Sequence, residues 1–338
     1  MVTAAVVLTD SAATMNRATL PINVRIVESL RELRRALSDY DNASELAALA
    51  DHLEAGGNLR SDAYGHYFAL VRAIQNEELG SIRPHLSALA RSSREPDLDI
   101  AIRMFGLEGF GRSKLRETSL QFASSSLSTT QMGTVPKGAH CRVRLTLSDS
   151  IKLIQSSAPI TWQALAKVTT EIIAVYGRPR GMMTFDGCSS LERYGAILIN
   201  MRRQRTALTM AETLVHESAH SLLFALSCND HRVLNPTSER YASPLRIDLR
   251  PLDGIYHAVF VLARMYSFVA EIERNPRAKN AMRIEAREVM EVRRKNFLDG
   301  YAVLIENARF TETGRRLLDD SLALVVGSTR AAQDSNGL

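Results

Sequence analysis

Apolar residues recur at helical spacing along the N-terminal third of the chain. Between Pro21 and Asp39 they form one face, with arginines and glutamates on the other. The residues of this face are Ile22, Val24, Ile26, Val27, Leu30, Leu33 and Leu37. Similar patterns predict four more helices, at Ser44–Glu54, Asp62–Gln75, Ser81–Ala90 and Asp97–Phe105. We therefore expect an all-helical N-terminal region.

A change in composition separates this region from the rest of the chain. The segment Phe122–Lys137, FASSSLSTTQMGTVPK, is rich in serine, threonine, glycine and proline, as linkers and long loops are. It predicts two domains, a helical region over residues 1–125 and a second domain over residues 126–338. The helical region is a candidate docking surface for a peptide, such as the leader of a precursor.

The pattern changes again after the linker. From His140 to Leu147 polar and apolar residues alternate, which predicts a half-buried strand. A helix is expected over Pro159–Tyr176, and strands over Met182–Phe185 and Ala196–Met201. Together these elements predict a mostly helical α+β fold, with a small antiparallel sheet next to the helix that follows.

That next helix, Thr209–Ser227, carries the strongest chemical signal in the sequence. It contains His216, Glu217 and His220 in the pattern HExxH. Two imidazoles four residues apart lie one turn apart on the same helix face, so both can bind one metal ion. The spacing of Thr209 and Glu212 matches a capping box and predicts a helix start near Met210. A sheet leading into such a helix is also known from zincin-like folds, by analogy.

A tight metal site needs a third ligand, and three downstream residues are candidates. His231 follows His220 by eleven residues, but Leu223 stands where metzincins have a glycine. Glu239 has nearly the spacing of proteases with a glutamate ligand, yet it lies in a proline-flanked loop. His257 lies in the first turn of an apolar helix that begins near Gly254, and we favour it over the other two.

Composition excludes several classes of protein. The formal charge of +5 is spread along the chain without an aromatic-interleaved basic motif, so nucleic-acid binding is not expected. The three cysteines are far apart and indicate neither a disulfide framework nor a CxxC metal site. We expect no signal peptide and no membrane span, and therefore a cytoplasmic protein. The oligomeric state stays open.

Three segments together resemble a known family. HESAHSLLF, SPLRIDLRPLDG and YHAVFVLARMY are similar to the HExxH-motif, 2-oxoglutarate-dependent peptide β-hydroxylases that act on ribosomally made, modified peptides (RiPPs). The resemblance covers roughly Ala196–Phe268, is weaker through the C-terminal helices, and does not extend to the N-terminal third.

This resemblance implies a reaction and a set of site residues. His216, His220 and His257 would bind Fe(II), leaving positions for 2-oxoglutarate and O2, and the substrate would be a ribosomal precursor peptide. Glu217 would act from beside the metal rather than as an obligatory base. An arginine would bind the far carboxylate of 2-oxoglutarate, and the candidates are Arg246, Arg250 and Arg264. For Arg246 and Arg250 the rival reading is a solvated loop, and for Arg264 it is a buried ion pair.

Two other functions remain open at this point. In a zinc peptidase, Glu217 would deprotonate a Zn(II)-bound water, and Glu239 or His257 would complete the coordination. In a non-catalytic peptide-binding module, the metal would be structural and the N-terminal helices would hold the peptide.

Overall fold

In the computed structural model, the described part of the chain forms two compact units. The described residues are 16, 19–91, 94–95, 100–105, 130–179, 185–203, 206–228, 230–243 and 246–335. Among them, one unit comprises residues 16–149 and Ala166–Cys228, and the other Ser150–Leu165 and residues 230–335. We call the first the sheet unit and the second the helical unit. Most described residues are helical, so the predicted α+β class is confirmed.

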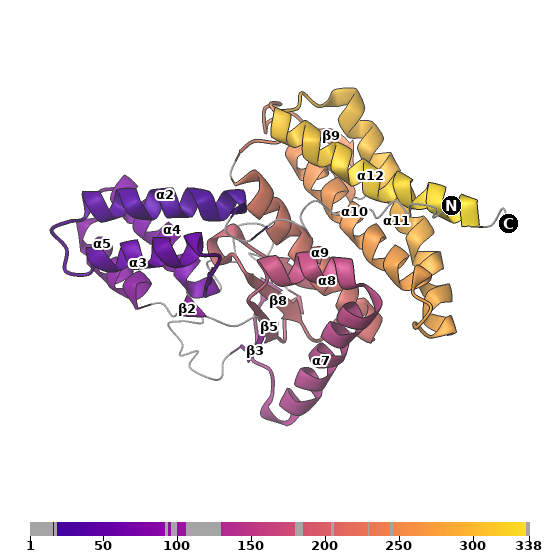
Figure 1. Ribbon diagram of the computed structural model, residues 1–338, viewed down its shortest axis with the longest axis horizontal. Coiled ribbons are helices and arrows are strands. Elements are labelled where there is room, and N and C mark those ends of the chain that lie inside the picture. Colours follow the sequence, from indigo (N-terminus) through magenta and orange to yellow (C-terminus); the bar gives the residue numbers. More distant parts are fainter. Residues whose placement is uncertain are drawn as a thin grey trace. The chain divides into compact units, whose positions relative to one another are not determined.

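The sheet unit begins with four helices that lie side by side (Figure 1). They are α2 (Pro21–Ala36), α3 (Ala43–Glu54), α4 (Ser61–Gln75) and α5 (Leu79–Ala90). Each matches a predicted helix to within a few residues. Leucines such as Leu30, Leu46 and Leu70 are fully buried between them, as the apolar faces require.

The N-terminal region is not all-helical, and the fifth predicted helix is wrong. Ala101–Met104 is a strand, β3, that pairs in parallel with β5 (Glu171–Val175). A short apolar run fits a strand or a helix turn equally well, and the partner β5 decides between them. Two further short strands in this region, β1 (Asn58–Leu59) and β2 (Arg94–Glu95), pair antiparallel with each other.

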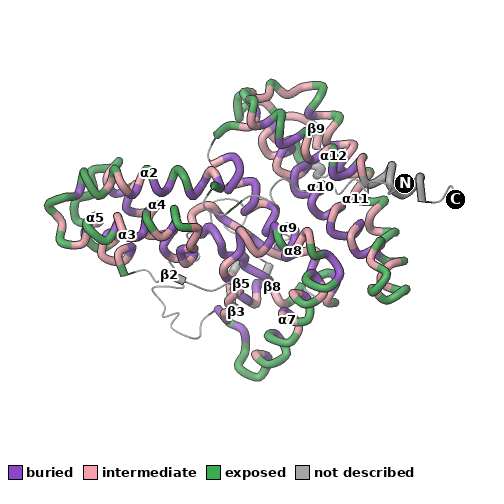
Figure 2. Tube along the Cα trace, in the orientation of Figure 1, coloured by how far each residue is buried: buried purple, intermediate pink, exposed green. Residues whose placement is uncertain are grey.

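The central sheet of this unit has the strand order β3-β5-β8-β7. The strands β3, β5 and β8 (Ala196–Asn200) are parallel, and only β7 (Gly187–Ser189) runs antiparallel, to β8. The sheet is therefore mixed, and the expected antiparallel pairing holds only at β7. Every residue of β5 and β8 is buried (Figure 2), as in parallel strands that are covered on both faces.

The predicted strand at His140–Leu147 is wrong, because this segment begins a helix, α7 (His140–Ser157). The buried apolar positions are Val143, Leu147 and Ile154, which recur at helical spacing, whereas Leu145 is 58% exposed. Over eight residues the alternation of polar and apolar side chains imitated a strand. Preceding it, η3 (Lys137–Ala139) is a 3-10 turn.

The predicted helix Pro159–Tyr176 contains two elements. Helix α8 (Pro159–Val168) ends early, and the buried run EIIAV forms β5. The parallel partners on both sides of β5 supply the hydrogen bonds that hold this run extended. Of the expected linker, β4 (Thr130–Gln131) pairs with β6 (Arg178–Pro179), and residues 122–129 lie outside the described part. The expected strand Met182–Phe185 also lies outside it, except for Phe185.

The helical unit is built on α10 (Leu252–Arg274), which packs against α11 (Asn280–Asn307) and α12 (Glu312–Ser335). The helix α10 is long and apolar enough to cross a membrane, but 78% of its most apolar stretch is buried within the protein (Figure 2). It is a core helix of the kind that soluble domains contain. Before it in the chain, β9 (Tyr241–Ser243) pairs antiparallel with β10 (Arg246–Arg250).

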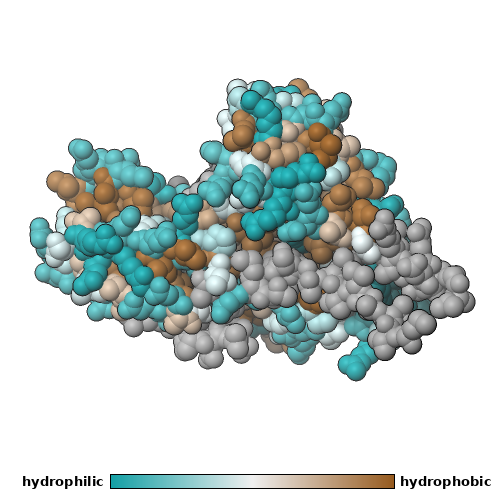
Figure 3. All heavy atoms as spheres, turned by 45° about the horizontal axis from the view of Figure 1, so that its top comes forward, coloured by the Kyte–Doolittle hydropathy of each residue, from teal (hydrophilic) through white to brown (hydrophobic). Residues whose placement is uncertain are grey.

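Exposed large apolar residues are scattered along the described chain. They include Leu79, Leu145, Leu234, Leu249 and Val292, which belong to different elements. On the face that Figure 3 presents, small hydrophobic areas are correspondingly interspersed with hydrophilic side chains. Scattered apolar side chains are normal on a protein surface and do not by themselves indicate a binding site.

Two side chains near the end of α10 hold the connection between α7 and α8. The Glu271 carboxylate accepts hydrogen bonds from the backbone N–H groups of Ile160 and Thr161, each at 2.9 Å. The Asn275 amide donates to the backbone oxygen of Ser156 at 2.9 Å. One face of α10 thus caps the start of α8 and contacts the last turn of α7.

Replacing Glu271 with glutamine is expected to destabilise the helical unit by about 1.5–3 kcal/mol, the usual contribution of hydrogen bonds to a charged group. Faster hydrogen exchange at the Thr161 amide would report the loss locally. The matched control is Glu273→Gln, because Glu273 pairs with the exposed Arg287 and such pairs contribute at most about 1 kcal/mol. Equal effects of the two substitutions would contradict the capping role of Glu271.

Candidate metal centre

The HExxH helix is α9 (Ala207–Ser227), and its start is set by a cap that the sequence pattern misplaced. The N-cap is Thr206, whose hydroxyl accepts from the Thr209 N–H at 3.1 Å, while the Thr209 hydroxyl accepts from the Thr206 N–H at 3.1 Å. The reciprocal box is therefore Thr206 with Thr209, three residues before the expected pair of Thr209 with Glu212. At the other end Cys228 adopts a left-handed conformation, with φ 42°.

His216 and His220 lie one turn apart on α9, as predicted. Their ring centroids are 5.0 Å apart, with an interplanar angle of 70°. The His216 side chain is 42% exposed, although Val215 and Ala219 beside these histidines are buried. The two imidazoles are thus close together on an accessible part of a helix that is otherwise core, which suits a shared metal ion.

Glu217 is buried and held by a strand that sequence reasoning missed. Its Oε2 accepts a hydrogen bond from the Ser189 hydroxyl of β7 at 2.9 Å, and its Oε1 lies 4.0 Å from His216 Nε2. Gly187 allows this close approach, because a Cβ there would lie 2.7 Å from Glu217 Cγ. The expected strand, Met182–Phe185, ends before β7, so no pattern in the sequence pointed to either residue.

Burial raises the pKa of Glu217 to about 8. Hydrogen bonds from Ser189 oppose this effect, and the nearby Asp186 carboxylate adds to it. Without a bound cation the protonated carboxyl therefore predominates at neutral pH. A cation on the neighbouring histidines would favour the carboxylate and lower the pKa.

His257 lies on α10, in the helical unit, where it is four-fifths buried. Its Nε2 is 3.7 Å from Oδ2 of Asp253, one turn earlier on the same helix. Arg232 binds the other oxygen of Asp253 through Nη2 at 2.7 Å and Nε at 3.0 Å. Burial, with the positive charge of Arg232, lowers the pKa of His257 to about 4. The imidazole is therefore neutral at pH 7, which is the form that binds metals.

The other two candidate ligands also belong to the helical unit. Glu239 accepts hydrogen bonds from the Tyr241 hydroxyl at 2.6 Å and from Asn235 Nδ2 at 3.1 Å. These two donors lower the pKa of Glu239 and give its carboxylate a local structural role. His231 is exposed, and its backbone oxygen accepts from the Thr311 hydroxyl.

The three candidate arginines have different environments, all in the helical unit. Arg264 is buried, donates through Nη1 to the Ser321 hydroxyl at 2.6 Å, and lies 3.7 Å from the ring centroid of Phe260. Arg250 pairs with Asp248 at 2.8 Å in β10. Arg246 is also in β10, but its side chain lies outside the described part. Ser321, which lies 57 residues from Arg264 in the chain, could not be linked to it from the sequence.

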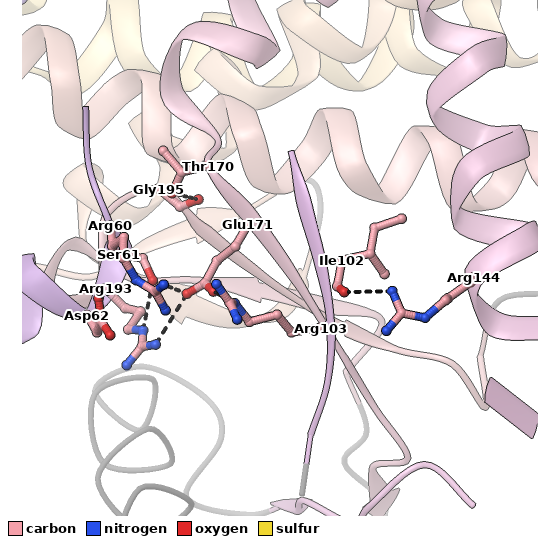
Figure 4. A network of polar contacts seen from close by, with 10 residues as sticks. All are labelled: Arg60, Ser61, Asp62, Ile102, Arg103, Arg144, Thr170, Glu171, Arg193 and Gly195. Carbon is pink, nitrogen blue, oxygen red and sulfur yellow. Dashed lines mark hydrogen bonds and ion pairs between the residues drawn. The ribbon is translucent and has the colours of Figure 1, made fainter. Parts of the chain in front are cut away.

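A second buried polar cluster lies at the start of β5. The Glu171 carboxylate accepts from the Ser61 hydroxyl, from Arg103 Nε at 2.8 Å and from Arg193 Nη2 at 3.2 Å. Figure 4 shows Ser61 and Arg193 on one side of this carboxylate and Arg103 on the other. The cluster joins α4, β3 and η4 (Leu191–Arg193) to the sheet, so we assign it a structural role. Nearby, Arg144 of α7 donates to the Ile102 backbone oxygen at 3.2 Å on the open edge of β3.

The donor set on α9 fits two ligands of a metal site. Within the described residues, no three or more His, Cys, Asp or Glu side chains are grouped so that they could hold a metal ion. His216 and His220 belong to the sheet unit, whereas His257, Glu239 and His231 belong to the helical unit. The third ligand and the kind of metal therefore stay predictions.

The comparisons with known proteins assign no family. No protein-family model matches the chain, and no curated protein matches it.

Proposed function

We propose that the chain is an Fe(II)- and 2-oxoglutarate-dependent hydroxylase of a ribosomal precursor peptide. The observation that carries the proposal is the His216–His220 pair, with rings 5.0 Å apart on an accessible face of α9. We propose His257 as the third ligand, as the family resemblance implies. The family resemblance of these three histidines selects iron and 2-oxoglutarate.

In the proposed reaction each group has a defined task. The peptide C–H bond, O2 and 2-oxoglutarate give a C–OH group, succinate and CO2, and bound iron supplies the activation of O2. The guanidinium of Arg264, which donates to the Ser321 hydroxyl, is the group we propose to bind the far carboxylate of 2-oxoglutarate. Arg250 and Arg246 are the alternative partners for that carboxylate. Glu217 acts from beside the metal by orienting neighbouring groups.

The proposal is tested with purified protein, Fe(II), 2-oxoglutarate and its native precursor peptide. We expect succinate release that depends on iron and on the peptide, together with a peptide product heavier by one oxygen atom. Arg264→Lys is expected to raise the KM for 2-oxoglutarate, because lysine does not reproduce the planar fork of arginine. Absence of coupled succinate and product would refute the proposal.

A zinc peptidase is the second candidate, and the position of Glu217 favours it. Its Oε1 lies 4.0 Å from His216 Nε2, where a general base for a metal-bound water would be placed. The Glu217→Gln variant separates the two candidates. It would abolish cleavage by a peptidase, whereas a hydroxylase in which Glu217 only orients neighbouring groups would retain part of its turnover.

We propose that the enzyme acts in the cytoplasm, where precursor peptides are made and iron stays reduced. The leader-docking role of residues 1–125 also stays a proposal. The packing of α2 against α9 within the sheet unit supports it, because a leader bound to these helices would be held in the same unit as His216 and His220.

A further inference from the structure

The strand β7 contacts α9 through alternate residues. Gly187 and Ser189 point to the same side of the strand, toward Glu217, as alternation along a strand requires. Cys188, between them, points to the other side and belongs to a buried cluster with Ile173, Phe185 and Leu198. Because Cys188 is anchored in the core, the position of β7 against the HExxH helix is well defined.

The approach of β7 to α9 is as close as glycine permits. A Cβ at Gly187 would lie 2.7 Å from Glu217 Cγ and 2.9 Å from Thr213 Cγ2, closer than real Cβ contacts. With hydrogen in its place, the backbone passes directly over the Glu217 side chain. The hydroxyl of Ser189, two residues later, can then reach the carboxylate.

The contact distinguishes the two oxygens of Glu217. Oε2 is bound to the Ser189 hydroxyl at 2.9 Å, and Oε1 is the oxygen that faces His216 Nε2 at 4.0 Å. A buried carboxylate without this donor could rotate or move toward a cation on the two histidines. The hydroxyl therefore sets which oxygen faces the metal ligands and keeps the carboxylate beside them.

We propose that Ser189 is a positioning residue for Glu217, with Gly187 allowing the close approach that its hydrogen bond needs. The inference deepens the proposed function and rests on His216 and His220 binding a metal. Without the Ser189 hydroxyl, only the backbone of Ser189 would still hydrogen-bond to Glu217, and the carboxylate would compete for a coordination position. If Ser189 only supplied a hydrogen bond to a buried carboxyl group, its replacement would leave the surroundings of the metal unchanged.

The test compares Ser189→Ala with Ser189→Thr, which retains the hydroxyl, and with the control Ser218→Ala. Ser218 is also buried and adjacent to Glu217, but its hydroxyl donates to the Val215 backbone oxygen within α9. Each protein is loaded with Co(II), and its visible absorption spectrum is recorded. We expect a changed spectrum for Ser189→Ala only, and wild-type spectra for the other two variants. In turnover with Fe(II), kcat should fall by ~10–100-fold in Ser189→Ala, with KM for the peptide nearly unchanged.

A Glu217→Ala background separates positioning from a general structural effect. There Ser189→Ala is expected to change the Co(II) spectrum no further, because the carboxylate that the hydroxyl orients is absent. A wild-type spectrum for Ser189→Ala, or the same change in both backgrounds, would overturn the proposal. If Ser189→Ala does not fold, Ser189→Cys takes its place, since a thiol is a weaker donor of similar size.

The outcomes also distinguish this inference from the proposed reaction. If Co(II) binds and Ser189→Ala changes its spectrum, but no succinate is released, the reaction is wrong and the role of Ser189 stands. If Co(II) does not bind to the wild-type protein, the metal site itself is refuted, and both proposals fall.

Discussion

Replacing Glu171 with alanine is expected to destabilise the sheet unit by about 3–5 kcal/mol. Glu171 is 5% exposed, and its carboxylate is bound by Arg103, Arg193 and Ser61 (Figure 4). The substitution removes the Glu171 carboxylate from beside the guanidinium of Arg193, which is itself 6% exposed. The loss of that partner, rather than the attraction within the intact pair, accounts for the size of the effect.

The measurement must report on the sheet unit, because two units need not unfold in one transition. Hydrogen exchange at the amides of β5 and β8 under native conditions gives the local opening free energy. The control is Glu192→Ala, which breaks a half-exposed pair with Arg72 at 2.8 Å and should cost less than about 1 kcal/mol. A similar small loss for Glu171→Ala would mean that water compensates Arg193, and our assignment of the cluster would be wrong.

The second large effect is expected at the metal centre. His220→Ala should weaken the binding of Co(II) or Fe(II) by at least ~100-fold, since changes around a ligand alone cost about 10–100-fold. His216→Ala should behave in the same way, because both imidazoles lie on one face of α9. Anaerobic titration with Co(II), followed by absorption, gives the affinities of the variants.

His231→Ala is the matched control, because His231 is exposed and lies outside α9. It should bind Co(II) as the wild-type protein does. His257→Ala, measured in the same series, decides the third ligand: a loss like that of His220→Ala assigns His257 to the site. Unchanged Co(II) binding in His220→Ala would exclude the HExxH metal site altogether.

Much of the helical structure could be predicted from spacing alone. The apolar faces of α2, α3, α4 and α10 are long enough for a period of 3.6 residues to be unambiguous. The pattern failed where runs were short. His140–Leu147 alternates over eight residues yet lies in α7, because Val143, Leu147 and Ile154 share the buried face. The runs that form β3 and β5 are extended because each has a parallel partner.

The candidate site likewise contains residues that the sequence predicts and residues that it does not. His216, Glu217 and His220 are determined by sequence, since the geometry of one helix brings them together. Gly187 and Ser189, which hold Glu217, could not be predicted, because they lie 28 or more residues away on β7. Nor could Arg232 beside His257, or Ser321 beside Arg264.

The sequence by itself thus determined the helices with long periodic faces and the two histidines that one helix turn brings together. The physical reason is that both depend on contacts between residues three or four apart. The tertiary structure alone decided which short runs became strands, which oxygen of Glu217 faces His216, and which groups surround His257 and Arg264. These depend on hydrogen bonds and packing between segments that are distant in the chain. The local spacing of residues does not reveal such contacts.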